Sequence, residues 1–205
     1  MSILDFRLLS SVCCVALSIA AVESAQAGIR VFGAAGYATT TNDDSTAPNK
    51  EMTGYDVNLT GQFDVLSLGV ASLYAGPSVK VSALSKDYTV GGVELTQALA
   101  ATHGGVEAGV HVGVIPLLTL QAGLNYNIGL NAKGTVEGTG FPTAEVEGES
   151  GSEMGVTVRA LFTPFPLLRA GVEVGVGSGS AQFKGESTKE KYTYSSYRAV
   201  VGLSL

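Results

Sequence analysis

A strict alternation of apolar and polar residues, repeated eight times at constant length, is the feature that most constrains this chain. In residues 118–126 (LTLQAGLNY), every second side chain is apolar or aromatic, and Thr, Gln, Gly and Asn stand between them. Successive side chains of a β-strand point to opposite faces, so each run predicts a strand with one apolar face. The other seven runs are 29–37, 55–63, 66–74, 106–114, 154–162, 168–176 and 197–205.

The connections between these runs alternate between short and long. The short connections are 64–65, 115–117 and 163–167, and in two of them a proline (Pro116, Pro166) precedes a Leu-Leu pair. The long connections are 38–54, 75–105, 127–153 and 177–196. Tight turns between alternating runs predict antiparallel hairpins.

Nine residues with one apolar face is close to the length that a tilted strand needs to cross a bilayer, about 9–11 residues. The opposite face carries charges, Asn and Gln, which are costly in a dry core. A soluble barrel would instead place its apolar face inside. We therefore predict an all-β fold, an eight-stranded antiparallel up-and-down transmembrane β-barrel over residues 28–205. Its short turns and both termini would be periplasmic and its long loops external.

Residues 1–27 have the features of a signal peptide. Arg7 precedes the apolar stretch 8–22, and Ala25-Gln26-Ala27 is a small-residue cleavage site. The alternative, a membrane anchor, needs about 20 apolar residues, and this stretch has 15. Both cysteines, Cys13 and Cys14, lie in this leader, so the mature chain would have no disulfide or thiol chemistry.

The net charge of −6 argues against a nucleic-acid partner, which would require a basic surface. Aromatic residues gather at the ends of the runs, with Phe at the short-turn end and Tyr at the other. Such rings at both edges of an apolar band predict an aromatic girdle. Its expected members are Tyr37, Tyr55, Phe63, Tyr74, Tyr126, Phe162, Phe165 and Tyr197.

The inward positions of the runs carry charges of both signs. They are Arg30, Asp56, Glu107, His111, Arg159, Arg169, Glu173 and Arg198. Buried charges must pair, so we expect an ion-pair network in the lumen, with Glu173 contacting Arg159 and Arg198 on neighbouring strands. The network would act as a packed plug that fixes the barrel's shape. A narrow conducting path is the alternative, and catalysis through His111 is a weaker third.

The loop between 127 and 153 is rich in glutamate. Glu145, Glu147 and Glu149 are candidates for binding a divalent cation that bridges to lipopolysaccharide, because hard cations prefer carboxylate oxygens. The more ordinary interpretation is a solvated surface. In the last loop Lys184, Lys189 and Lys191 are candidates for contacts with lipid phosphates.

Across residues 28–205 the chain resembles the small eight-stranded outer-membrane barrels of Gram-negative bacteria, the OmpA/OmpX type. Those proteins end in an alternating strand with a terminal aromatic residue that the barrel-assembly machinery recognises. Here the corresponding residues are Tyr197, Ala199, Val201, Leu203 and Leu205, with leucine in the last place.

The resemblance implies a place in the bacterial outer membrane, contact with its lipid and lipopolysaccharide, and assembly by that machinery. It is a likeness of architecture, from which function does not follow. We expect a structural or surface-interaction role through the long loops, with an unknown extracellular ligand, no cofactor and no enzymatic activity. The alternative is a narrow, porin-like channel or carrier for small solutes. A lipid A-modifying enzyme is a third and weaker possibility.

Overall fold

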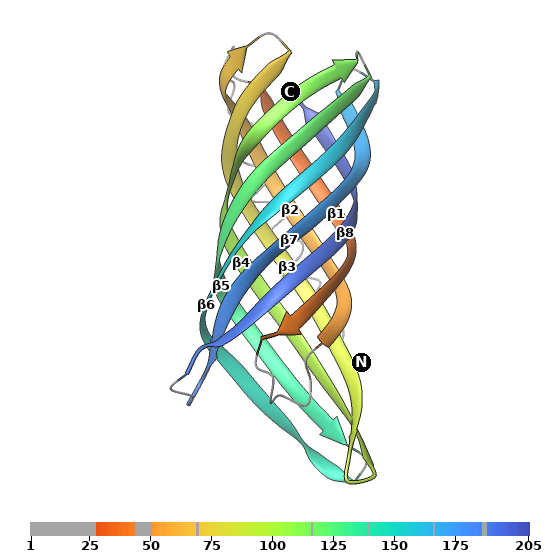
Figure 1. Ribbon diagram of the computed structural model, residues 1–205, viewed down its shortest axis with the longest axis vertical. Helices are drawn as coiled ribbons and strands as arrows, with labels where there is room; N and C mark the ends of the chain where they lie inside the picture. Colours follow the sequence, from red (N-terminus) through yellow and green to blue (C-terminus); the bar gives the residue numbers. More distant parts are fainter. Residues whose placement is uncertain are drawn as a thin grey trace.

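The computed structural model describes residues 28–43, 51–68, 70–115, 117–138, 140–165, 167–185 and 188–205. The predicted leader and its cleavage site lie outside these residues. Eight strands follow one another along the chain: β1 (Ile29–Asn42), β2 (Glu51–Leu68), β3 (Ala71–Val90), β4 (Val93–Ile115), β5 (Leu118–Gly138), β6 (Phe141–Phe165), β7 (Leu168–Phe183) and β8 (Glu190–Ser204). Each pairs antiparallel with its neighbours, and β1 pairs with β8, so the sheet closes into a barrel (Figure 1). In the described part of the chain, no helix is long and apolar enough to cross a membrane.

The strands are longer than the alternating runs, which corrects the predicted bounds of the long loops. Most of 75–105 and 127–153 continues the strands β3 to β6 as two long hairpins. The β3–β4 hairpin closes at Gly91 and Gly92, whose φ angles of 60° and 86° are in the left-handed region that favours glycine. Figure 1 shows both hairpins extending past the other strands at the end of the barrel opposite the short turns.

The first short turn lies later in the chain than predicted. β2 continues through 64–65 to Leu68 with a bulge between Asp64 and Leu66, and β3 begins at Ala71. Paired residues of antiparallel strands share a face, and Leu68 pairs with Ala71. This pairing shifts the alternation by one place. The predicted run 66–74 therefore covers the end of β2 and the start of β3 rather than one strand. Leu73 therefore faces outward, and Ser72 and Tyr74 face the lumen.

The apolar faces of the strands form the outer wall of the barrel. Leu124, Val172 and Val201 are 65%, 61% and 56% exposed. The inner wall is mostly polar, but it also holds an apolar cluster that the sequence analysis did not predict. This cluster consists of Phe32, Ala34, Leu161 and Val200.

Two inner glycines make room for a large side chain. A Cβ atom on Gly109 or Gly123 would lie 2.8 or 2.5 Å from the hydroxyl oxygen of Tyr74. The Tyr74 hydroxyl therefore occupies space that side chains on β4 and β5 would have filled. A barrel of eight strands has an interior that side chains can fill, and these glycines let one bulky residue reach across it.

Candidate functional site: the charged bore and its vestibule

Five buried charges alternate in sign across the lumen. The order is Asp56 (β2), Arg198 (β8), Glu173 (β7), Arg159 (β6) and Glu107 (β4), and each residue is at most 4% exposed. We call these five residues the bore network. Arg198 Nε donates to Asp56 Oδ1 at 2.8 Å, and Arg159 donates from its Nη2 atom to Glu107 Oε2 at 2.8 Å. Glu173 accepts from both arginines and so joins the two halves.

The strand register explains why these groups meet. Arg159 pairs with Glu173 across β6 and β7, and Glu173 pairs with Arg198 across β7 and β8. Gly36 of β1 lies opposite Arg198 on one side and Asp56 on the other. Because glycine has no side chain, the arginine and the aspartate meet over β1. A Cβ atom on Gly36 would lie 1.9 Å from the carbonyl oxygen of Tyr197.

Neutral polar groups complete the shell around Glu107. The hydroxyl of Tyr74 donates to Glu107 Oε1 at 2.9 Å, and the side-chain amide of Gln62 donates to the same atom at 3.3 Å. Gln121 exchanges amide hydrogen bonds with Gln62 and accepts one from Arg159. A buried ion pair stabilises only when its remaining hydrogen-bonding capacity is satisfied, and Glu107 meets this condition.

Two further buried ion pairs lie on either side of the bore network. Lys80 pairs with Glu153 toward the loop end, where its ammonium group also lies 4.3 Å from the centroid of the Tyr194 ring. Arg30 pairs with Asp64 toward the short-turn end, with 3.1 Å between Nη1 and Oδ2. Sequence reasoning missed Asp64, Lys80 and Glu153 because it assigned them to a turn and to loops. Extending the inward alternation of run 154–162 by one residue would have found Glu153, whereas run 66–74 had the wrong phase and would have placed Lys80 on the outer wall.

Among the described residues, two predicted members of the lumen network take part in no ion pair. The Nδ1 atom of His111 is 3.3 Å from the side-chain amide nitrogen of Gln121, and no ion pair among the described residues includes this histidine. The buried Nε and Nη1 atoms of Arg169 have no hydrogen-bond partner in the same part of the chain. There, too, no group of three His, Cys, Asp or Glu side chains is placed to hold a metal ion.

The outer aromatic residues lie mostly where the girdle requires. Tyr37, Tyr55, Tyr126 and Tyr197 are exposed on the outer wall toward the loop end, and Phe162 and Phe165 are exposed near the short turns. Phe63 is half-buried. Tyr74 is a correction: it is 2% exposed, and its hydroxyl binds Glu107 inside the barrel. The phase shift at the β2–β3 turn is the cause.

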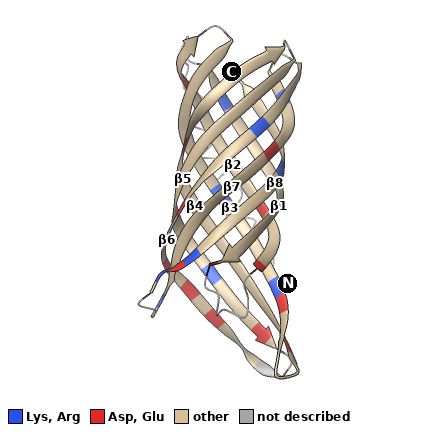
Figure 2. Ribbon diagram, viewed as in Figure 1, with Lys and Arg blue, Asp and Glu red and all other residues tan. Residues whose placement is uncertain are grey.

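The glutamates predicted to bind a cation lie along the outer part of β6. Glu145 pairs with Lys133 at 2.9 Å, and Glu147 pairs with Lys184 at 3.3 Å. Lys133 of β5 and Lys184, just after β7, thus neutralise two of the three glutamates. The two ion pairs and Glu149 form a charged region near the loop end (Figure 2), and the three carboxylates do not converge on one point.

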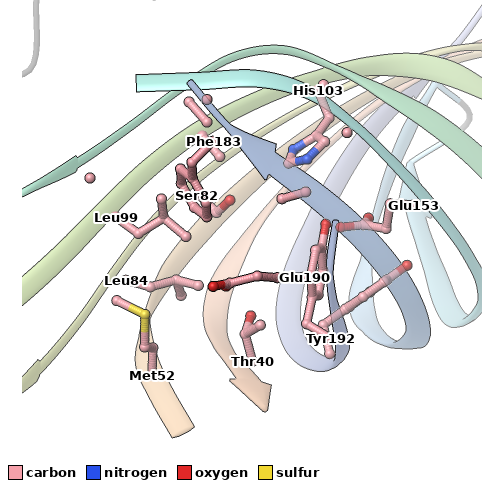
Figure 3. A pocket seen from close by; sticks show the side chains of 18 of the residues that line it. Thr40, Met52, Ser82, Leu84, Leu99, His103, Glu153, Phe183, Glu190 and Tyr192 are labelled. Atoms are coloured by element: carbon pink, nitrogen blue, oxygen red, sulfur yellow. The ribbon is translucent and has the colours of Figure 1, made fainter. Parts of the chain in front are cut away.

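A cavity of about 300 Å³ opens at the loop end, above the Lys80–Glu153 pair. We call it the vestibule, and residues from all eight strands line it (Figure 3). Below that pair, the second cavity measures only about 10 Å³ and ends at Arg198 and Glu107. The lumen is therefore open at one end and filled at the bore network. Burial raises the pKa of the Tyr192 hydroxyl in the vestibule wall, and the negative charge of Glu153 raises it further.

Together, the closed eight-stranded sheet, its apolar outer wall and its charged bore define a transmembrane type of β-barrel. Comparison with known proteins supports this class. The chain matches a major outer-membrane protein of Thermus thermophilus, with a TM-score of 0.52 and 12% identity over 88% of this chain and all of that one. It matches Neisserial surface protein A with a TM-score of 0.50 and 10% identity over 85% of this chain and 96% of that one.

The outer-membrane protease OmpT of Escherichia coli also matches, with a TM-score of 0.48 and 9% identity over 89% of this chain and 98% of that one. No family model and no curated protein matches the chain by sequence. At these identities the structural matches bear on the fold alone. The chain has the fold of the outer-membrane β-barrel proteins.

Proposed function

We propose that the protein is a non-conducting barrel of the bacterial outer membrane with a structural or surface-interaction role. The bore network is the observation that carries this proposal. Five buried charges span the lumen from β2 to β4 through β8, β7 and β6, and the cavity beside them has a volume of only about 10 Å³. A hydrated ion would have to displace paired charges to pass, which makes the lumen a poor conductor.

The outer wall supports lipid contact. Large apolar side chains are exposed on all eight strands, among them Leu120, Val158 and Leu203. Soluble monomers rarely expose contiguous apolar patches beyond a few hundred Å², so a continuous apolar band requires a covering. Bilayer lipid fits this band, and the exposed tyrosines would lie at its outer edge, next to lipopolysaccharide. The leader 1–27 would export the chain, and the barrel-assembly machinery would insert it.

The two long hairpins are the parts that would meet an external partner. The β3–β4 and β5–β6 hairpins extend beyond the girdle, and β6 presents Glu145, Glu147 and Glu149 along one edge. Binding residues tend to lie on such projecting segments, which a rigid scaffold holds in place. A surface-interaction role therefore falls to these hairpins.

Conductance in planar bilayers tests the closed lumen. The wild-type protein should insert without producing discrete current steps, and Arg159→Ala, which removes one of the two cations of the bore network, should produce them. The variant thus serves as a positive control for insertion and detection. Reproducible steps from the wild-type protein would favour the channel or carrier and end the non-conducting proposal.

Surface labelling of intact cells tests the orientation. An epitope inserted between Gly91 and Gly92, at the tip of the β3–β4 hairpin, should be accessible to antibody without permeabilisation. The same epitope next to Val70, in the β2–β3 turn, should be accessible only after the outer membrane is opened. The opposite pattern would show that the short turns are external.

A further inference from the structure

The vestibule has an apolar wall, although the lumen below it is mostly polar. Ala38, Met52 and Leu84, from β1, β2 and β3, are buried together, and Leu99 of β4 packs against them. All four line the 300 Å³ cavity. Figure 3 shows Met52, Leu84 and Leu99 gathered on one side of it. A cavity of this size, with a mainly apolar lining and a few polar groups, has the character of a small-molecule site.

A carboxylate faces this apolar wall. In Figure 3 the side chain of Glu190 extends across the cavity in the direction of Leu84. Its Oε2 atom accepts a hydrogen bond from the side-chain amide of Asn42 at 3.2 Å, which holds it in place. In the described part of the chain, Glu190 and Glu149, both lining residues, have no ion-pair partner.

The basic residues of the lining do not neutralise this acidity. Lys80 is already paired with Glu153 at the floor, and Lys191 is the other lysine of the lining. Of the four carboxylates in the lining, Asp56 is paired with Arg198 and Glu153 with Lys80, which leaves Glu149 and Glu190 against Lys191. The vestibule therefore favours a positively charged ligand over an anion.

A buried polar atom in the wall independently points to a ligand. His103 of β4 is only 7% exposed and lines the vestibule, and its buried Nδ1 atom has no hydrogen-bond partner among the described residues. A buried polar atom without a partner is destabilising, so such atoms usually meet a ligand or water. Figure 3 shows the imidazole ring at the side of the cavity, directed inward.

From these observations we propose that the vestibule binds a small organic cation with an apolar body, such as an aryl- or alkylammonium ion. The ammonium group pairs with Glu190. The apolar body packs on Met52, Leu84 and Leu99, and a polar substituent can satisfy His103. The residues that contact the ligand are not members of the bore network, although Asp56 of that network also lines the vestibule, and the proposal does not depend on whether the barrel conducts.

Titration calorimetry with three probes of similar shape tests the proposal: 3-phenylpropylammonium, 3-phenylpropan-1-ol and 3-phenylpropanoate. The protein is held in lipid nanodiscs, and empty nanodiscs supply the background. The ammonium probe should bind at least tenfold more tightly than the other two. Glu190→Gln should weaken its binding about tenfold, because the variant keeps the shape and a hydrogen-bond acceptor but loses the charge that pairs with the ammonium group.

Two more variants complete the test. Leu99→Asn alters the half-buried edge of the apolar wall and should weaken all three probes. Glu94→Gln removes an exposed carboxylate on the same β3–β4 hairpin but outside the vestibule, and it should leave binding unchanged. Gel mobility before and after boiling establishes that each variant is folded. Equal affinity for the three probes, no effect of Glu190→Gln in the folded protein, or binding no greater than that of empty nanodiscs would each overturn the proposal.

Discussion

Replacing Arg159 by methionine tests whether the bore network is held together by charge balance. The network contains three carboxylates and two guanidinium groups, and Arg159 contacts two of the carboxylates. Without it, Glu173 retains Arg198, but Glu107 keeps only the neutral donors Tyr74 and Gln62. Breaking a buried ion pair by removing one partner costs about 3–5 kcal/mol, and we expect a loss of that size in the free energy of unfolding.

A second substitution isolates the cause. The double variant Arg159→Met with Glu107→Gln returns the remaining network to the net charge of the wild type. Contacting residues commonly show coupling energies of about 0.5–3 kcal/mol, so the double variant should be more stable than Arg159→Met alone by about 1–3 kcal/mol. Urea unfolding in lipid vesicles, followed by circular dichroism and extrapolated linearly, measures each value. Additive losses would mean that packing, rather than charge, accounts for the cost.

Three further predictions concern the wall of the barrel. Leu124→Arg places a charge on the lipid face near mid-membrane and should cost about 2–4 kcal/mol in vesicle unfolding, whereas Ile128→Arg near the outer edge should cost about 0–1 kcal/mol; equal costs would contradict the assigned depth. Gly36→Ala forces a methyl group against the backbone of β8 and should lower the free energy of unfolding by about 1–3 kcal/mol in the same assay. An unchanged free energy of unfolding would show that β1 and β8 can move apart there. The unboiled wild-type protein should migrate differently from the boiled protein on a denaturing gel, and identical mobility would count against a closed barrel.

The strand number, the order of the strands and the lipid-facing positions could be predicted from the sequence because alternation records which face meets lipid. The pairing of Glu173 with two arginines could also be anticipated, since their positions on adjacent strands follow from the hairpin order. Tyr74 could not be placed, because a two-residue turn inverts the phase of the alternation and the sequence does not mark where that turn occurs. Asp64 was missed for another reason: β2 continues past the end of the alternating run, through a bulge between Asp64 and Leu66.

The alternating pattern did not predict the loop-end parts of the strands. The physical reason for this also accounts for the vestibule. Below the girdle, most large apolar side chains of β1 and β2 point outward, as Tyr37 and Tyr55 do, and Phe32 and Ala34 of β1 are inward exceptions. One residue further toward the loop end of β1, Ala38 faces inward, and on β2 Met52 does the same. Their outward neighbours there are polar, including Thr39 and Thr53.

This inversion is what a change of solvent requires. Where lipid surrounds the barrel, burying apolar surface means turning it outward, and where water surrounds it, burying apolar surface means turning it inward. The apolar positions therefore change parity where the strand leaves the bilayer, and a search for uninterrupted alternation stops at that point. Leu84 of β3 and Leu99 of β4 continue the inward set on the next two strands. An apolar cavity above a charged bore is thus the expected result when strands of one barrel pass from lipid into water, and the parity change indicates in the sequence where that boundary lies.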